Sequence, residues 1–133
     1  MKGTIFLFLS LVCFSALADD NPFVGTWKLV KGEYVNHEGK VVDYASLNMQ
    51  STKIITPTHF SFVSKSNGAF WAAGVGTYSH STSTYTEQLE LASFNYEENG
   101  AYPFEYNIKG DRWHNERFKD GKRVEYEVWQ KVN

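Results

Sequence analysis

The chain has 133 residues, and its 13 lysines and arginines stand against 15 aspartates and glutamates, for a formal net charge of −2. This near-neutral balance argues against nucleic acid or an anionic membrane surface as the main partner, because such partners select strongly basic surfaces. The length suits one domain with one hydrophobic core, and the single cysteine excludes an intrachain disulfide.

The first eighteen residues have the pattern of a secretory signal peptide. Lys2 supplies the charged start, residues 5–14 form the apolar run, and Ala16-Leu17-Ala18 matches the A-x-A cleavage box. The apolar run is too short for a membrane-spanning helix. We therefore expect cleavage near Ala18, which leaves a single domain over residues 19–133.

The expected destination of this domain is outside the cytoplasm, secreted or periplasmic, and it is not expected to be an integral membrane protein. The sequence has no N-x-Ser/Thr glycosylation site, which favours a bacterial envelope over a eukaryotic secretory route. Lipid anchoring at Cys13 is disfavoured, because Val12 stands where a small residue is required.

After this segment the sequence consists of short β-type runs separated by turn residues. The first run, residues 23–36, is followed by the turn-like "HEGK", a short "VVDY", and "ASLNMQ" at 45–50, the only segment that favours a helical turn. The next run, residues 51–65, contains Pro57. It is a kinked strand or two separate strands, because proline cannot serve a central ladder.

The second half of the chain continues this pattern, with turn signals at "SNG", "YEENGA", Gly110-Asp111 and "DGK", the last a strong hairpin signal. The predicted strands here are residues 69–80, 83–94, 102–109, 111–119 and 123–132. Seven or eight consecutive strands with almost no helix predict an all-β fold, an antiparallel up-and-down β-barrel, with a β-sandwich as the alternative.

The segment "NPFVGTWKLV" carries the pair Gly25-x-Trp27, and this signature resembles the first strand of the calycins, which comprise lipocalins and fatty-acid-binding proteins. The segments "KIITPTHFSFV", "GVGTY", "YTEQLELAS", "IKGDRWH" and "EYEVWQKV" are similar to small secreted bacterial lipocalin-like domains of unknown function. Together these segments cover most of residues 23–132. The resemblance implies a calycin barrel of about eight strands with an internal cavity, and it implies no known activity. Gly25 and Trp27 would form the barrel floor.

Two features depart from the fatty-acid-binding proteins. Those proteins have two helices after the first strand, whereas residues 32–50 here are too few and too turn-rich for such a lid. They also hold a carboxylate with an Arg-x-Tyr pair on the last strand. Here the spacing is Arg123-x-x-Tyr126, which by simple alternation puts the two residues on opposite faces. In lipocalins the tryptophan packs under a basic side chain from the chain end, a part open to Lys131 or Arg123.

The inward face of the last strand stays open at this stage. Val124, Tyr126 and Val128 form its more apolar face, so alternation sends Glu125 to solvent. If the strand instead had the orientation found in fatty-acid-binding proteins, Glu127 and Trp129 would line the cavity.

The strand "YTEQLEL" places a carboxylate on an apolar face. Glu87 alternates with Tyr85, Leu89 and Leu91, so we expect it to point inward. A buried carboxylate must be protonated or paired, and the donors available by type are Tyr78, Tyr106, Tyr126 and Trp113. Glu87 is then a structural acceptor or a ligand contact. A catalytic role would require a histidine, with His59 and His114 as the candidates, or a second carboxylate with a shifted pKa beside it.

Taken together, these patterns predict a barrel that binds a small apolar or aromatic molecule non-covalently, because small-molecule sites combine aromatic walls with a few polar groups. The cavity candidates are Phe60, Phe62, Tyr78, Tyr85, Glu87, Leu89, Phe104, Tyr106, Trp113, His114 and Trp129. No nucleophile elbow, phosphate-binding glycine loop or metal-ligand spacing occurs, so we expect no catalytic residue, metal or cofactor. The alternatives are a cavity isomerase, lyase or hydrolase using Glu87 with a histidine, and an envelope interaction module with a filled barrel. No oligomeric state is indicated.

Overall fold

The computed structural model describes residues 20–133, so the predicted signal peptide lies outside the described residues. The chain forms nine strands and a short 3-10 helix, η1 (Tyr44–Leu47). The strands are β1 (Gly25–Val35), β2 (Val41–Asp43), β3 (Met49–Ile55), β4 (His59–Ser66), β5 (Ala69–His80), β6 (Thr84–Ala92), β7 (Ala101–Lys109), β8 (Arg112–Lys119) and β9 (Lys122–Lys131). Within residues 20–133, no helix has the length and apolar character needed to cross a membrane.

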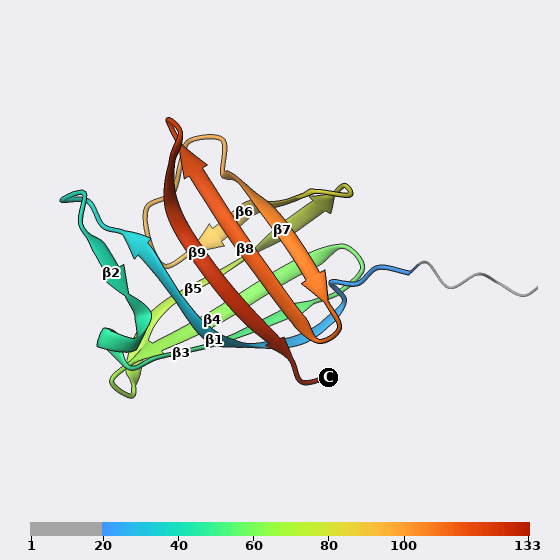
Figure 1. The fold of residues 1–133 in the computed structure, drawn as a ribbon, viewed down its shortest axis with the longest axis horizontal. Helices are drawn as coiled ribbons and strands as arrows, with labels where there is room; N and C mark the ends of the chain where they lie inside the picture. Colours follow the sequence, from blue (N-terminus) through green and yellow to red (C-terminus); the bar gives the residue numbers. More distant parts are fainter. Residues whose placement is uncertain (1–19) are drawn as a thin grey trace, which may run out of the picture.

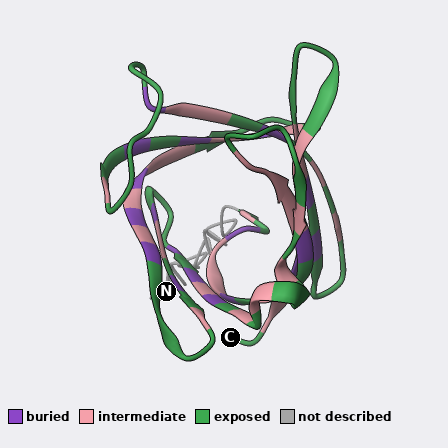
Figure 2. Cartoon of the chain, turned by 90° about the vertical axis from the view of Figure 1, so that its left-hand side faces the viewer, coloured by how far each residue is buried: buried purple, intermediate pink, exposed green. Residues whose placement is uncertain are grey.

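All neighbouring strands are antiparallel, in the order β2-β1-β3-β4-β5-β6-β7-β8-β9, and pairing of β1 with β9 closes the sheet into a ring (Figures 1 and 2). Eight strands form the barrel, and the three-residue β2 pairs only with one end of β1. The predicted all-β, antiparallel up-and-down barrel is therefore confirmed, and the sandwich alternative is wrong. Closure removes the free edges that an open sheet would leave.

The turns follow the sequence signals. Pro57 lies between β3 and β4, so the run 51–65 is two strands joined by a tight turn. Asn67-Gly68 and Asp120-Gly121 all have positive φ, between 51° and 78°, as the two-residue hairpin turns of a right-handed twisted ribbon require. These turns join β4 to β5 and β8 to β9.

Four β-bulges interrupt the simple alternation of side chains. The pairing register skips Val30 in β1, Trp71 in β5, Glu90 in β6 and Val124 in β9. Each extra residue bends the strand and reverses the side on which the following residues point. Leu91, which simple alternation places inward with Glu87, is 71% exposed for this reason.

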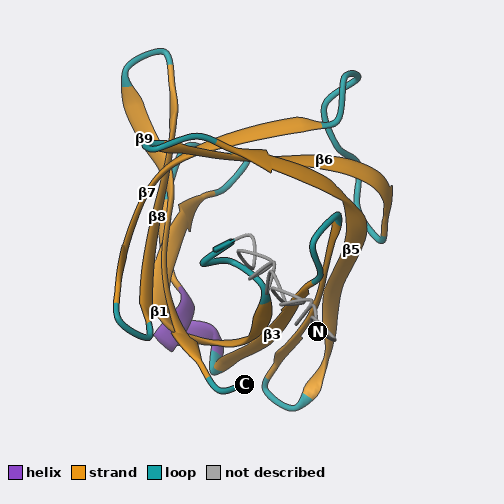
Figure 3. Ribbon diagram, turned by 90° about the vertical axis from the view of Figure 1, so that its right-hand side faces the viewer, coloured by secondary structure: helices purple, strands orange, loops and turns teal. Residues whose placement is uncertain are grey.

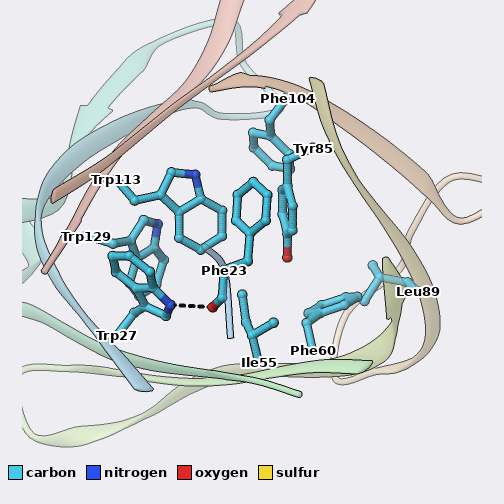
Figure 4. Packing of buried hydrophobic residues seen from close by; sticks show 9 residues of the cluster. All are labelled: Phe23, Trp27, Ile55, Phe60, Tyr85, Leu89, Phe104, Trp113 and Trp129. Carbon is cyan, nitrogen blue, oxygen red and sulfur yellow. Dashed lines mark hydrogen bonds between the residues drawn. The ribbon is translucent and has the colours of Figure 1, made fainter. Parts of the chain in front are cut away.

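One end of the barrel is filled by a cluster of aromatic side chains, which we call the plug. Phe23 lies at its centre, with its ring centroid 4.8 Å from Tyr85 and 5.1 Å from Trp113 (Figure 4). The buried members of the plug are Phe23, Trp27, Ile55, Phe60, Tyr85, Leu89, Phe104, Trp113 and Trp129. The chain enters β1 at this end, beside the C-terminus (Figures 1 and 3), whereas β2 and η1 lie at the opposite end (Figure 1).

Trp27 behaves as the resemblance implies for a barrel floor. It is fully buried, and its indole N–H donates to the Phe23 carbonyl at 2.8 Å. The Lys131 ammonium lies 5.5 Å from the Trp27 ring centroid, so Lys131 rather than Arg123 is the basic residue that covers it. Gly25 has a φ of 142°, and a Cβ there would lie 2.3 Å from the Asn133 carbonyl oxygen. The residue must be glycine because the chain end crosses directly over it.

Gly76 supplies a test of this packing. A Cβ at Gly76 would lie 1.9 Å from the Gln88 backbone oxygen in the neighbouring strand β6. We expect Gly76→Ala to lower the free energy of unfolding by about 2 kcal/mol or more, because the two strands must separate locally. Urea denaturation measures the change. The control is Thr77→Ala, the next residue on the opposite face of β5, and an equal loss in both variants would contradict this explanation.

Candidate functional site

A cavity of about 290 Å³ occupies the part of the barrel beyond the plug. Leu89, Phe104 and Trp129 belong to the plug and also line the cavity, so the plug forms the cavity floor. The remaining wall is largely apolar and aromatic, with four charged residues. It is formed by Leu29, Tyr34, Tyr44, Met49, Ser51, Lys53, Phe62, Ser64, Trp71, Ala72, Glu87, Phe94, Tyr102, Glu125 and Glu127.

Aromatic side chains mark where the cavity reaches the surface. Trp71 and Phe94 line the cavity yet are 43% and 40% exposed. The Trp71 ring lies 5.8 Å from that of Tyr34, which stacks on Tyr44 at 5.7 Å. Trp71 is the bulged residue of β5, and bulges commonly re-aim a side chain in this way. Tyr44 is held in η1, where the Asp43 carboxylate accepts a hydrogen bond from the Ala45 N–H at 2.8 Å.

A buried ion pair lies at the level where the plug meets the cavity. Lys53 from β3 donates to Glu87 Oε1 from β6, and the residues are 3% and 6% exposed. The Tyr85 hydroxyl donates to the same oxygen at 3.1 Å. The second oxygen, Glu87 Oε2, has no hydrogen-bond donor among residues 20–133. Glu87 thus points inward as predicted, but its main partner is a lysine rather than the tyrosine and tryptophan donors proposed from sequence.

Aromatic rings surround the Lys53 ammonium. It lies 5.0 to 5.9 Å from the ring centroids of Trp129, Trp113, Tyr85 and Phe60, which favours a cation electrostatically. Burial would lower the pKa of Lys53, but the attraction of nearby carboxylates, above all Glu87, leaves the pKa raised. Lys53 is therefore charged. For Tyr85, burial and then the charge of Glu87 raise the pKa, so its hydroxyl stays protonated and acts as a donor.

Two further carboxylates from β9 line the cavity. Glu125 pairs with Arg117 of β8 at 2.7 Å. Glu127 Oε2 accepts a hydrogen bond from the Trp129 indole at 2.8 Å, and the residue has no ion-pair partner among residues 20–133. Burial raises the pKa of Glu127 to about 7; Lys53 opposes this rise, and Glu125 reinforces it.

The charges around the cavity do not cancel. Three carboxylates, those of Glu87, Glu125 and Glu127, face two cations, Lys53 and Arg117, which leaves one negative charge in excess when all are ionised. Glu127 is the carboxylate without a cationic partner. The site is thus an aromatic pocket whose wall is acidic rather than basic.

The structure divides the residues predicted for the cavity into three groups. Phe62, Glu87, Leu89, Phe104 and Trp129 line it. Phe60, Tyr85 and Trp113 belong to the plug beneath it, and Tyr78 and Tyr106 pack against the plug from the closed end. His114 is a correction. It is exposed on the outer face of β8, because it alternates with the buried Trp113.

The proposed pairing of Glu87 with a histidine does not occur. His59 is exposed at the start of β4, where its Nδ1 lies 2.7 Å from the Thr58 hydroxyl, and His114 is exposed as well. Both imidazoles lie outside the barrel. No group of three or more potential metal ligands occurs in the part of the chain that the structure describes.

Two predictions about the last strand, β9, are wrong. Glu125 lines the cavity instead of pointing to solvent, together with Glu127 and Trp129. Arg123 and Tyr126 share the outer face, where the guanidinium lies 4.6 Å from the tyrosine ring. The cause is the bulge at Val124, which reverses the alternation between Arg123 and Glu125.

Lys53 was not among the predicted cavity residues, although the β3–β4 turn indicates that its side chain points inward. A tight turn around Pro57 pairs Ile55 with Phe60 and Lys53 with Phe62, and cross-strand partners share a face. The inward face of β4 therefore identifies that of β3. Trp71 and Tyr44 had no such signal, because a bulge and a 3-10 turn position them.

Comparisons with known proteins identify no family for this chain. No family model and no curated protein matches it. Among solved structures, the crystal structure of Echinococcus granulosus fatty-acid-binding protein 1 is similar, with a TM-score of 0.48 and 12% sequence identity. The match covers 84% of this chain and 98% of that one. A likeness this weak carries no conclusion about what this chain binds.

The buried ion pair predicts an asymmetric response to mutation. We expect Lys53→Met to lower the free energy of unfolding by about 3 kcal/mol, because it leaves Glu87 buried without its cation. The double variant Lys53→Met/Glu87→Leu should recover most of that loss, because both charges are gone. Urea denaturation of Lys53→Met and of the double variant measures both changes in the free energy of unfolding. Lys28→Met, at an exposed position of β1, is the control, and a double variant no more stable than Lys53→Met would contradict the prediction.

Glu127 predicts a pH dependence of stability. Its pKa is about 7 in the folded protein against an ordinary value of 4.5, so between these values the folded state binds more protons than the unfolded state. The free energy of unfolding should therefore fall as pH rises from about 4.5 to about 7, by on the order of 1 to 3 kcal/mol from this group. Chemical denaturation across this range, compared with Glu127→Gln, isolates the effect. Parallel curves for the two proteins would refute it.

Proposed function

We propose that this protein binds a small apolar or aromatic molecule non-covalently inside its barrel. The observation that carries the proposal is the open, aromatic-walled cavity of about 290 Å³ above a filled plug. Ligand sites in proteins are concave, largely apolar and furnished with a few aimed polar groups, and this cavity has that composition. Binding would occur outside the cytoplasm if the N-terminal segment acts as a signal peptide.

The closed barrel favours binding without a large conformational change. Hydrogen bonds join every strand to its neighbours around the ring, so the walls are held independently of any ligand. The polar groups that would orient a ligand come from β3, β6 and β9, three separate parts of that ring. A preformed site of this kind loses little conformational entropy when it is occupied.

The alternative functions have less support. The enzyme hypothesis depended on His59 or His114 beside Glu87, and both of these histidines lie on the outer face. The interaction-module hypothesis depended on a filled barrel, whereas this barrel contains a cavity. Binding is the function for which the described residues supply the required geometry.

Filling the cavity tests the proposal directly. We expect N-phenylnaphthylamine, a neutral probe that fluoresces in apolar surroundings, to bind saturably. The substitution Ala72→Phe places a ring in the cavity and should weaken that binding by about tenfold or more. Ala73→Phe adds the same ring at the next residue of β5, which does not line the cavity, and should leave binding nearly unchanged.

Three outcomes would contradict this function. They are an absence of saturable fluorescence with the unaltered protein, equal weakening in both variants, and full binding by Ala72→Phe. Circular dichroism of both variants would establish that they retain the fold.

A further inference from the structure

We propose that the cavity selects ligands carrying a positively charged amine next to an aromatic or apolar group. This inference rests on the proposed function, because it names the chemical class of molecule that the same cavity would take. It is drawn from the charges and rings around the cavity.

The first observation is the unmatched carboxylate. Lys53 is paired with Glu87, and Arg117 with Glu125, so both cations near the cavity are already neutralised. Glu127 lines the cavity with only the neutral Trp129 indole bonded to it. A ligand ammonium would supply the missing charge and a hydrogen-bond donor, whereas a ligand carboxylate would add to the excess.

The second observation is a carboxylate oxygen without a donor, on a residue that lines the cavity. Glu87 is 6% exposed and lines the cavity, and its Oε2 has no donor among residues 20–133. An acceptor in the cavity wall that the protein leaves without a donor favours a ligand that brings N–H groups. Among residues 20–133, the buried side-chain donors without a partner are Asn115 Nδ2 and Arg117 Nε, and neither residue lines the cavity.

The third observation is the aromatic wall. The rings of Tyr34, Trp71 and Trp129 line the cavity together with those of Tyr44 and Tyr102. The faces of such rings attract cations, as Lys53 already demonstrates at the floor, where four ring centroids lie within 5.9 Å of its ammonium. An organic amine would therefore find a carboxylate at one end of the cavity and rings along its sides.

An anionic ligand finds no corresponding anchor. Arg123 is on the outer face, where its guanidinium pairs with Glu33 and Glu116 at 2.9 Å. Lys131 covers Trp27 at the closed end and does not line the cavity. The cationic side chain in the cavity wall is Lys53, whose ammonium donates to Glu87.

Three probes of nearly equal size test the inference, namely naphthylethylamine, naphthylethanol and naphthylacetate, titrated by isothermal calorimetry at pH 8. We expect the amine to bind about tenfold more tightly than the alcohol, and the carboxylate to bind more weakly than both. Glu127→Gln keeps the shape and an acceptor for Trp129 but removes the charge. It should reduce the amine-to-alcohol ratio to about twofold or less. Glu105→Gln, on the exposed face of β7, should retain the full ratio.

The preference should also depend on pH. The charged and titratable groups facing Glu127 are Lys53 from β3, Glu87 and Tyr85 from β6, Glu125 from β9 and Tyr44 from η1. Because Glu127 ionises near pH 7 and the amine stays protonated, the amine-to-alcohol ratio should rise between pH 6 and pH 8. The ratio for Glu127→Gln should change little over the same range.

The outcomes separate the two proposals. If all three probes bind without preference for the amine, or if Glu127→Gln keeps the preference, the inference about charge fails and the binding function stands. If the carboxylate binds best, the inference is reversed. If none of the three probes binds, the proposed function fails and the inference fails with it.

Discussion

The ion pair between Lys53 and Glu87 is the interaction on which the interior of this barrel depends. It joins β3 to β6 across the inside, although β4 and β5 separate these strands in the sheet. Two buried charges are costly to desolvate, and the surrounding groups offset that cost. Tyr85 donates a hydrogen bond to the carboxylate, and aromatic rings surround the ammonium. These same groups form the boundary between the plug and the cavity.

The division of the barrel into plug and cavity follows from where the chain enters. Phe23, just ahead of β1, packs against both Tyr85 and Trp113 and fills the closed end. At the other end lies the cavity, and η1 contributes Tyr44 to its wall. The cavity wall is acidic because β9 presents Glu125 and Glu127 inward, opposite Lys53 of β3. Shape and charge of the site thus come from different strands of one closed sheet.

Bulges explain most differences between the predicted and observed positions of side chains. Glu87 and Tyr85 precede the bulge of β6 and lie where alternation puts them, whereas Leu91 follows it and is exposed. In β9 the bulge at Val124 brings Arg123 and Tyr126 to the same outer face. A bulge is fixed by the fit between two strands, so the pattern within one strand does not reveal it.

The sequence by itself determined the strands, their hairpin order, the barrel and the inward position of Glu87, because turn residues and period-two alternation are local properties of the chain. The tertiary structure decided which groups meet inside. Lys53 reaches Glu87 from 34 residues away, and Glu127 lacks a cation because Arg117 and Lys53 are held by other carboxylates. Such pairings depend on the curvature and closure of the whole sheet, which bring distant strands within contact distance across the interior. Local sequence patterns therefore indicated the class of fold, whereas the chemistry of the site depended on contacts between distant strands.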